Sequence, residues 1–261
     1  MAEKASAAHC FCTVPVTFDQ SLFQNNLRTQ TFGRPLHWFE TLPSTSTQLW
    51  ELVRQGAAPG TAVIAAQQQA GRGQWGRSWS SPPGGLYLSV ALLNRQSNAV
   101  PRTAVPDAIA PLSADQTPQL TVCSAWGVAS ALRNLDIPVT LKWPNDLLLH
   151  GKKLGGILTE TTVQKNQITA AILGIGLNWT NPVPETGITL TSVLQDCAQI
   201  TCLEQLAALM LQGLENGYQR WQTAGIEALL PDYLHLVTAW QASQTTMRLS
   251  DTLILSLKSL P

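Results

Sequence analysis

A glycine- and arginine-rich segment between two apolar runs is the feature that most limits what this chain can fold into. Residues 65–85 read Ala-Ala-Gln-Gln-Gln-Ala-Gly-Arg-Gly-Gln-Trp-Gly-Arg-Ser-Trp-Ser-Ser-Pro-Pro-Gly-Gly, and the runs on either side have the composition of buried strands. The glycines permit positive φ and a close approach of the backbone to a ligand, while the arginines supply charge that binds phosphate or carboxylate. These residues are Gly71, Arg72, Gly73, Gly76 and Arg77. The segment predicts an anion-binding loop, with a solvated hairpin turn as the alternative.

The loop differs from the two common nucleotide-binding motifs. Gly71 is not followed at the required spacing by the Gly-Lys-Ser/Thr of a Walker phosphate loop, and no helical pattern opens at Gly76 as a dinucleotide fingerprint requires. The ligand of this loop must therefore be identified from residues elsewhere in the chain.

Composition argues against several classes of partner. Of the 261 residues, 44% are apolar and nine are tryptophan, which is enough to bury a substantial core. Lys and Arg balance Asp and Glu at 16 each, so no basic field attracts nucleic acid or an anionic membrane surface. No apolar run has the length of a membrane span, and no signal peptide is expected behind Lys4. We expect a globular protein that binds neither nucleic acid nor membrane.

The cysteines predict a reducing compartment and a cytoplasmic location, because five of them, an odd number, do not form a disulfide framework. His9, Cys10 and Cys12 have no second pair at zinc-site spacing, since Cys197 and Cys202 are too isolated to complete one. We interpret the cysteines as small buried or incidental thiols rather than metal ligands.

Hydrophobic periodicity predicts a mixed order of strands and helices. Strands are expected at residues 35–42, 61–67, 86–93, 139–143, 147–150, 154–162 and 168–175, the last four as an antiparallel meander with turns at Gly151 and Asn166. Helices are expected at residues 45–55, at 117–135 with Thr117 as the cap, and from a capping box at 201–204 to about Gly225. Residues 1–33 are predicted as a short helix or arm, 94–116 as a connection without regular structure, and 226–261 as one more short helix with one or two strands.

A second informative stretch lies at residues 141–160. It reads Leu-Lys-Trp-Pro-Asn-Asp-Leu-Leu-Leu-His-Gly-Lys-Lys-Leu-Gly-Gly-Ile-Leu-Thr-Glu, two short strands whose turn would bring Lys142 and Lys153 near one another. The polar Trp-Pro-Asn-Asp corner is costly between apolar strands unless its groups are bonded or used. Lys152 is interpreted as a solvated turn residue, and Asp146 as either a turn-closing side chain or a functional group. Lys153 is predicted to be functional, because the glycines that follow clear space beside its ammonium group.

Four motifs together resemble biotin–protein ligases in their order and spacing. They are Gln-Gln-Ala-Gly-Arg-Gly at residues 68–73 with Arg77 and Trp79, Lys-Trp-Pro-Asn-Asp at 142–146, Lys-Leu-Gly-Gly-Ile-Leu at 153–158, and Gly-Ile-Gly-Leu-Asn at 174–178. Each motif alone is weak, whereas the set is specific, and the resemblance extends over roughly residues 44–223.

The resemblance implies an α+β fold, a class II synthetase-like mixed sheet packed by helices on one side, with a truncated or absent C-terminal SH3-like barrel. The implied division is an N-terminal arm at residues 1–33, a catalytic domain at 34–225 and a C-terminal remnant at 226–261.

The resemblance also implies two half-reactions. Biotin and ATP give biotinoyl-5′-AMP and pyrophosphate, and the biotinoyl group then passes to a lysine of the biotin carboxyl carrier protein of acetyl-CoA carboxylase. ATP and Mg²⁺ are the implied cofactors, with no metal ligand assigned directly and Asp146 the residue expected near the ion. By this resemblance Lys153 and Arg72 are catalytic, because they offset the repulsion between the biotin carboxylate and the α-phosphate. Amides of loop residues 71–76 are implied to clamp the same junction.

The remaining site residues follow from the same resemblance. The implied biotin-binding residues are Ser44, Thr45, Gln68, Gly71, Arg72, Lys153 and Gly156, of which Ser44, Thr45 and Gln68 hold the ureido group. The implied ATP- and phosphate-binding residues are Gly73, Arg77, Trp79, Lys142, Asp146 and Asn178, with Arg77 on the outgoing phosphates. Trp79 is either a core residue or a ligand contact, and Asp146 either pairs with Lys142 or orders the metal.

Three departures from the family pattern bear on the implied function. Ser46 stands where asparagine is common, Gln74 stands where a further arginine is common, and residues 238–261 do not resemble the family's ending. The second bears on retention of the intermediate, and the third on carrier docking and ATP ordering. No N-terminal DNA-binding domain is expected, so the resemblance implies no repressor activity.

Two other functions stay open at this point. A lipoate–protein ligase or octanoyltransferase shares the fold and a reactive-site lysine, although the Gly-Arg-Gly and Lys-Trp-Pro-Asn-Asp pair favours biotin. The other is a non-catalytic relative that binds biotin or a nucleotide without turnover.

Overall fold

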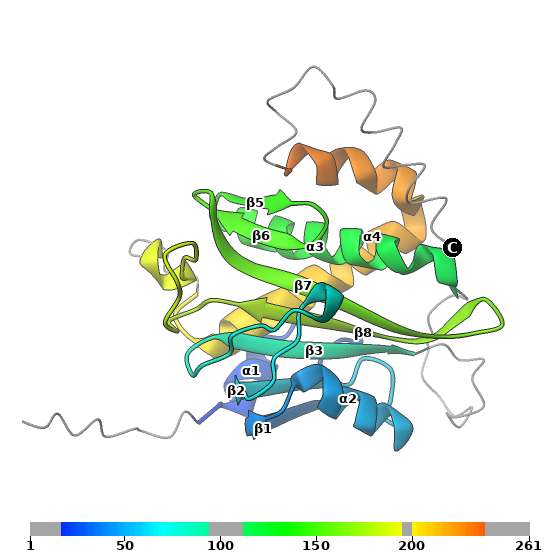
Figure 1. Ribbon diagram of the computed structural model, residues 1–261, viewed down its shortest axis with the longest axis horizontal. Helices are drawn as coiled ribbons and strands as arrows, with labels where there is room; N and C mark the ends of the chain where they lie inside the picture. Colours follow the sequence, from blue (N-terminus) through cyan, green and yellow to red (C-terminus); the bar gives the residue numbers. More distant parts are fainter. Residues whose placement is uncertain (1–16, 94–111, 195–199, 238–261) are drawn as a thin grey trace, which may run out of the picture.

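The computed structural model describes residues 17–93, 112–194 and 200–237, in which one mixed sheet is covered by helices on both faces (Figure 1). The strands are β1 (Leu36–Leu42), β2 (Ala62–Gln68), β3 (Leu86–Leu93), β4 (Leu112–Ser113), β5 (Val139–Lys142), β6 (Asp146–Leu149), β7 (Lys152–Gln164) and β8 (Gln167–Leu177). The helices are α1 (Gln20–Asn26), α2 (Thr45–Arg54), α3 (Thr117–Arg133) and α4 (Leu203–His235), with 3₁₀ turns at Gln74–Gly76, Ala114–Gln116 and Leu190–Ser192. The predicted α+β sheet is confirmed. The predicted barrel remnant at residues 238–261 lies outside the described residues.

The sheet combines one parallel unit with an antiparallel meander. Its order is β1-β2-β3-β8-β7-β6-β5, with β4 paired to β8. β1 and β2 run parallel with α2 as the crossover between them, and the other pairings of the described sheet are antiparallel. The predicted meander from β5 to β8 is confirmed. Its predicted turn residues Gly151 and Asn166 adopt φ values of 75° and 63°.

Alternation along the strands divides the interior into two cores. On β2, Ala62 and Ile64 belong to the core shared with α1, α3 and α4, whereas Val63 and Ala65 belong to a smaller core with Leu49 of α2. The expectation of helices on one side of the sheet is therefore wrong. A strand that is apolar at every position must be covered on both faces, and α2, beside β1 and β2 in Figure 1, supplies the second cover.

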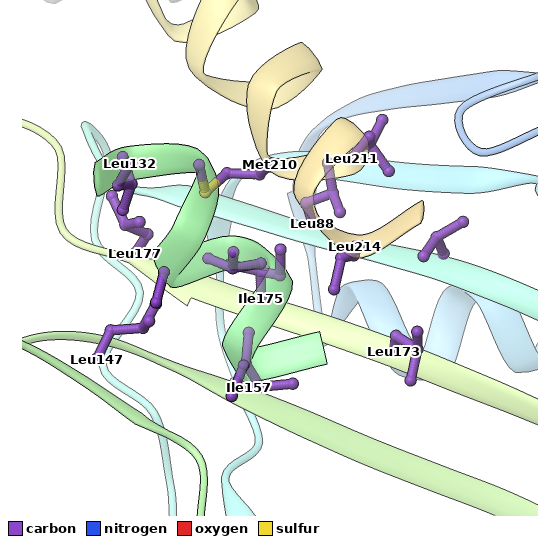
Figure 2. Close-up of a cluster of buried hydrophobic side chains, with 14 of the residues drawn as sticks. Leu88, Leu132, Leu147, Ile157, Leu173, Ile175, Leu177, Met210, Leu211 and Leu214 are labelled. Carbon is purple, nitrogen blue, oxygen red and sulfur yellow. The ribbon is translucent and has the colours of Figure 1, made fainter. Parts of the chain in front are cut away.

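The larger core lies between the sheet and the α3–α4 pair (Figure 2). The labelled side chains of Figure 2 that fill it include Leu88, Leu173, Ile175, Leu177, Leu132, Met210, Leu211 and Leu214. Where the helices cross, a Cβ at Gly127 of α3 would lie 2.1 Å from the carbonyl oxygen of Gly213 and 2.9 Å from Cα of Gly217, both on α4. The two helix backbones are therefore in direct contact at this crossing.

The helix α4 begins and ends differently from the prediction. At Gly225 the backbone leaves the helical region (φ 78°, ψ 168°), but the helix resumes as a second arm as far as His235. The predicted end is thus a kink, and the predicted short helix beyond it is that arm. At the start, Cys202 is the N-cap, and Gln205 rather than Glu204 accepts the backbone N–H of Thr201 (2.8 Å). The predicted capping box is wrong because the Glu204 carboxylate instead accepts the N–H of a residue that precedes α1.

The segment before α3 is more regular than predicted. Residues 112–116 form β4 and a 3₁₀ turn, closed by a capping box between Ser113 and Gln116. Thr117 is therefore the first residue of α3 rather than its cap, and its hydroxyl donates to the Ala114 carbonyl (2.9 Å). Residues 94–111, which the same prediction covered, lie outside the described residues.

Two predictions on thiols and membranes concern only part of the chain. Cys123 is a buried free thiol and Cys202 a half-buried one, whereas His9, Cys10, Cys12 and Cys197 lie outside the described residues. Among the described helices, none combines the length and apolar character that crossing a bilayer requires.

Candidate active site

A cavity of about 350 Å³ lies between the Gly/Arg loop, the Trp-Pro-Asn-Asp corner and the start of β7. It brings together eight residues predicted from the sequence: Arg72, Gly73, Arg77, Trp79, Lys142, Asp146, Lys153 and Gly156. Residues that the sequence did not single out for the site also line it, namely Trp75, Ser78, Trp143, Pro144, Asn145, Ile157 and Leu158, together with Gln74. Two parts of the chain that are far apart in the sequence, residues 72–79 and 142–158, therefore meet at one site.

The Gly/Arg loop is held in shape by bonds within itself. The Gly73 N–H donates to the Arg77 carbonyl (2.7 Å), and the Trp79 N–H donates to the Gly71 carbonyl (2.8 Å). A Cβ at Gly71 would lie 2.4 Å from the carbonyl oxygen of Trp79, so the return strand of the loop passes too close for any side chain there. The amide of Gly73 is thus used inside the loop, and the expectation that the amides of residues 71–76 clamp an anion stays a prediction. The loop presents the side chains of Arg72 and Arg77 to the cavity.

Lys153 projects into the cavity between a carboxylate and an indole ring. Its Nζ lies 2.8 Å from Oδ1 of Asp146 and 5.3 Å from the centroid of the Trp79 ring. The ion-pair partner of Asp146 is therefore Lys153, although Lys142 is the residue opposite Asp146 in the register of β5 and β6. Of the two glycines predicted to clear space for the ammonium, Gly156 lines the cavity, whereas Gly155 lets the β8 backbone approach, since its Cβ would lie 2.6 Å from Gly176 O.

Arg72 is held by a residue that the sequence reading missed. Its Nη2 lies 2.5 Å from Oε1 of Glu160 on β7, and the other carboxylate oxygen accepts the hydroxyl of Ser46. Burial raises the pKa of Glu160 above its ordinary value, although the Arg72 charge and a hydrogen bond from the Trp50 side chain lower it. The sequence did contain a signal for Glu160. Side chains two residues apart on a strand share a face, so Glu160 lies on the same face of β7 as Gly156 and Leu158.

The residues predicted to hold the ureido group form a polar network that does not line the cavity. The Gln68 side-chain oxygen accepts the backbone N–H of Thr45 (2.8 Å), and the Gln68 amide donates to Ser81 Oγ (2.8 Å). The Thr45 hydroxyl also lies 2.8 Å from Ser89 Oγ. Ser44 is buried at the N-cap of α2. The assignment of Ser44, Thr45, Gln68 and Gly71 to biotin stays a prediction.

Asn178 lies behind the cavity wall rather than in it. Its side chain is buried and donates to the Lys153 carbonyl (3.2 Å), while its backbone N–H donates to the Leu154 carbonyl (2.8 Å). Asn178 therefore fixes the strand from which Lys153 projects, and its predicted contact with ATP is not tested by this arrangement.

Trp79 is both a packing residue and a cavity residue. A Cβ at Gly176 would lie 2.5 Å from its Nε1, so the indole rests directly on the backbone of β8. Its Nε1 is buried and has no hydrogen-bond partner among the described residues. The glycine at 176 is thus required by the ring that also lies beside Lys153.

Comparison with known proteins agrees with this geometry. The family model described as "Biotin/lipoate A/B protein ligase family" matches residues 38–178. The bifunctional ligase/repressor BirA of Bacillus subtilis is 34% identical over 166 residues, 63% of this chain and 46% of the relative. Biotin–protein ligase 2 of Arabidopsis thaliana is 31% identical over 216 residues, 82% of this chain and 61% of the relative. The chain thus spans about half of the first of these relatives and somewhat more of the second.

A solved structure gives the same result for the fold. The biotin protein ligase of Aquifex aeolicus in complex with biotin and ATP superposes with a TM-score of 0.59 at 25% sequence identity, covering 78% of this chain and 79% of the other. The family match extends over more than half of the 261 residues and contains the Gly/Arg loop, the polar corner and Lys153, all of which line the cavity. The chain therefore belongs to the biotin/lipoate A/B protein ligase family.

Proposed function

We propose that this chain adenylates biotin with ATP to biotinoyl-5′-AMP and pyrophosphate, and then transfers the biotinoyl group to a lysine of the biotin carboxyl carrier protein of acetyl-CoA carboxylase. The observation that carries the proposal is the convergence of Lys153, Arg72 and Arg77 on one cavity. Lys142 also lines this space of about 350 Å³, and the four cations together suit a reaction between two anions. Family membership and the likeness to a biotin protein ligase solved with biotin and ATP support the same reaction.

Charge neutralisation is the main task of the residues around the cavity. A carboxylate and an α-phosphate brought to about 4 Å repel each other by about 4 kcal/mol at an effective dielectric constant of roughly 20. Lys153 removes this repulsion when its ammonium lies between the two anions, and Arg72 can bind either of them through its planar guanidinium. Both residues are held by carboxylates in the ligand-free protein, Lys153 by Asp146 and Arg72 by Glu160. The substrates therefore replace or share existing ion pairs rather than meet unpaired charges.

The residues present fit a magnesium ion that arrives with ATP. Asp146 is the carboxylate among the residues that line the cavity, and Mg²⁺ bound through substrate phosphates uses only one or two protein carboxylates. No cluster of three or more His, Cys, Asp or Glu side chains capable of holding a metal occurs in the described ranges 17–93, 112–194 and 200–237. Asp146 would hold the ion once Lys153 has moved to the substrate. When bound, Mg²⁺ would neutralise charge on the outgoing phosphates.

Pyrophosphate exchange tests the first half-reaction. Labelled pyrophosphate is incubated with ATP, the protein and either biotin, lipoate or octanoate, and label in ATP is counted. We expect label to enter ATP when biotin is the added acid, and not when lipoate or octanoate takes its place. Exchange with lipoate or octanoate would instead assign the chain to the lipoate branch of the family, and biotin binding without exchange would make it a non-catalytic relative.

The second half-reaction requires the carrier. We expect labelled biotin to be transferred to the apo form of the acetyl-CoA carboxylase carrier protein, in the presence of ATP, and not to the same carrier with its acceptor lysine replaced by arginine. Exchange without transfer would leave the adenylation proposal standing and would refute the proposed partner.

A further inference from the structure

The Trp-Pro-Asn-Asp corner is held from outside the family-matched region. The corner joins β5 to β6 and carries Lys142 and Asp146 at its two ends. On one side the Asn145 side chain donates to the Ile157 carbonyl (2.8 Å), and the Ile157 N–H donates to the Asn145 carbonyl (3.0 Å). Among the bonds between described residues, these two attach the Asn145 side of the corner to β7 and leave its Trp143–Pro144 side to be held from elsewhere.

The second arm of α4 supplies the missing attachment. The hydroxyl of Tyr233 donates to the Pro144 carbonyl (3.0 Å), and the Tyr233 ring meets the ring of Trp143 edge to face, with centroids 5.8 Å apart at 83°. One residue past the arm, the carbonyl of Leu236 accepts the N–H of Leu141 (2.7 Å), just before the corner. The arm thus contacts the corner by a hydrogen bond, by a ring and by the adjoining strand.

The tyrosine itself has little freedom. Tyr233 is fully buried, and Leu229 and Leu230 of the same arm are buried in the larger core. Burial raises the pKa of Tyr233, and the nearby Asp146 carboxylate raises it further, so the hydroxyl stays a neutral donor. Asp146 in turn holds Lys153, so a continuous set of contacts connects the arm to the reactive lysine.

We propose that Tyr233 is a positioning residue for the nucleotide side of the active site, which it serves by fixing the Pro144 carbonyl and the Trp143 ring and thereby the placement of Lys142 and Asp146. The inference rests on the proposed function for what is bound there. It extends the site to a residue outside the matched range of 38–178.

The test is Tyr233→Phe, which removes the hydroxyl and keeps the ring. The chain offers a matched control in Tyr218→Phe, since Tyr218 lies on the same helix and its largely buried hydroxyl has no hydrogen-bond partner among the described residues. Because one neutral hydrogen bond corresponds to a fold-change of about three to ten, we expect Tyr233→Phe to raise the apparent KM for ATP by that factor in pyrophosphate exchange. The KM for biotin is expected to stay within about twofold of the wild-type value, and the control is expected to change neither KM.

Amide hydrogen exchange supplies a readout that does not depend on activity. We expect the amides of residues 142–147 to exchange faster in Tyr233→Phe than in wild type or Tyr218→Phe, with the strand amides of β3 and β8 unchanged. If Tyr233→Phe and Tyr218→Phe both match wild type in the KM for ATP and in the amide hydrogen exchange of residues 142–147, Tyr233 does not position the corner. An equal rise in the KM values for ATP and biotin would show general loosening and would also refute the proposal. Absence of biotin-dependent pyrophosphate exchange in the wild type would refute the proposed function instead, and the amide measurement would still decide the role of Tyr233.

Discussion

At the residue scale, the cations of the active site are defined by the carboxylates that hold them. Lys153 is paired with Asp146, and Arg72 with the mostly buried Glu160. Exposed ion pairs contribute little to stability, so these pairs are better understood as devices that keep long side chains in place for a substrate.

We expect Lys153→Met to fold normally and to lose biotin-dependent pyrophosphate exchange by at least about 10²–10³-fold, because a positioned charge that meets developing charge contributes several kcal/mol to the barrier. Lys152→Met is the matched control, since its side chain is the exposed neighbour at the β6–β7 turn, and it should change exchange less than about twofold. Exchange within a fewfold of wild type in a folded Lys153→Met protein would contradict the catalytic assignment.

Gln74 lines the cavity at the position where the family resemblance has an arginine. A charge-assisted hydrogen bond is about 1 kcal/mol stronger than a neutral one, which corresponds to roughly fivefold in an off-rate. We therefore expect Gln74→Arg to slow the release of preformed biotinoyl-AMP several-fold while leaving the adenylation rate nearly unchanged. A chase of labelled intermediate from both proteins measures the release. The neighbouring Trp75, which is 88% exposed on the rim, offers a comparison, since Trp75→Arg adds the same charge one residue away.

Glu160 predicts a pH effect on stability whose sign follows from its burial. Its pKa is raised in the folded protein, so the folded state binds the proton more tightly than the unfolded chain does. The stabilisation that this gives is fully present below the ordinary carboxyl pKa and is lost as the pH rises through the raised value. Urea unfolding of wild type and Glu160→Gln should show wild type losing stability relative to the variant as the pH rises above the ordinary carboxyl pKa of about 4.3. If wild type instead gains stability relative to Glu160→Gln as the pH rises, the Arg72 charge outweighs the effect of burial on Glu160.

At the element scale, the close crossing of α3 and α4 depends on glycine. Replacing a glycine inside a helix by alanine ordinarily stabilises it by about 0.5–1 kcal/mol. The Cβ of an alanine at position 127 would lie 2.1 Å from the carbonyl oxygen of Gly213, so the two helices would have to move apart. We expect Gly127→Ala to destabilise the fold by about 1–3 kcal/mol in urea unfolding, whereas Ser130→Ala on the same helix should change it by less than about 0.5 kcal/mol. A stabilised Gly127→Ala protein would mean that the crossing is looser than this geometry.

At the scale of the whole molecule, one buried carboxylate joins the N-terminal segment to the C-terminal helix. Glu215 of α4, 3% exposed, accepts the backbone N–H groups of Gln30, Thr31 and Phe32 at 2.7, 2.7 and 3.0 Å. Phe23 and Leu27 of the predicted N-terminal arm lie in the larger core together with α4. The second arm of α4, beyond Gly225, contributes side chains to the same core. The larger core therefore contains residues on both sides of positions 33 and 225, and the division of the chain at these positions stays a prediction.

We expect Glu215→Gln to destabilise the protein by about 2–4 kcal/mol, because the side-chain amide can accept at only one oxygen and its NH₂ group faces backbone donors. Glu51→Gln is the control, since the side chain of Glu51 is exposed and its carboxylate bonds the nearby side chains of Arg54 and Gln55; its effect on stability should be much smaller. Equal effects of the two substitutions in urea unfolding would show that the amide cluster does not hold the segment in place.

Local patterns in the amino-acid sequence were enough to predict several elements of this protein. The strand at residues 86–93, the turn residues Gly151 and Asn166, and the helices at α2 and α3 were predicted to within one or two residues, because periodicity and turn chemistry act over short distances. The Gly/Arg loop and Lys153 were predicted as parts of a site from their residue types and neighbours, and both line the same cavity.

The contacts between groups that are distant in the sequence are a property of the folded chain. The tertiary structure paired Asp146 with Lys153 rather than Lys142, placed Glu160 against Arg72, and used Glu204 for the chain before α1 rather than for its own helix cap. It also placed α2 on the face of the sheet opposite the other helices and Tyr233 behind the polar corner. Such contacts join residues separated by up to 185 positions, and their geometry is set by sheet order and helix crossing, which a linear pattern does not contain.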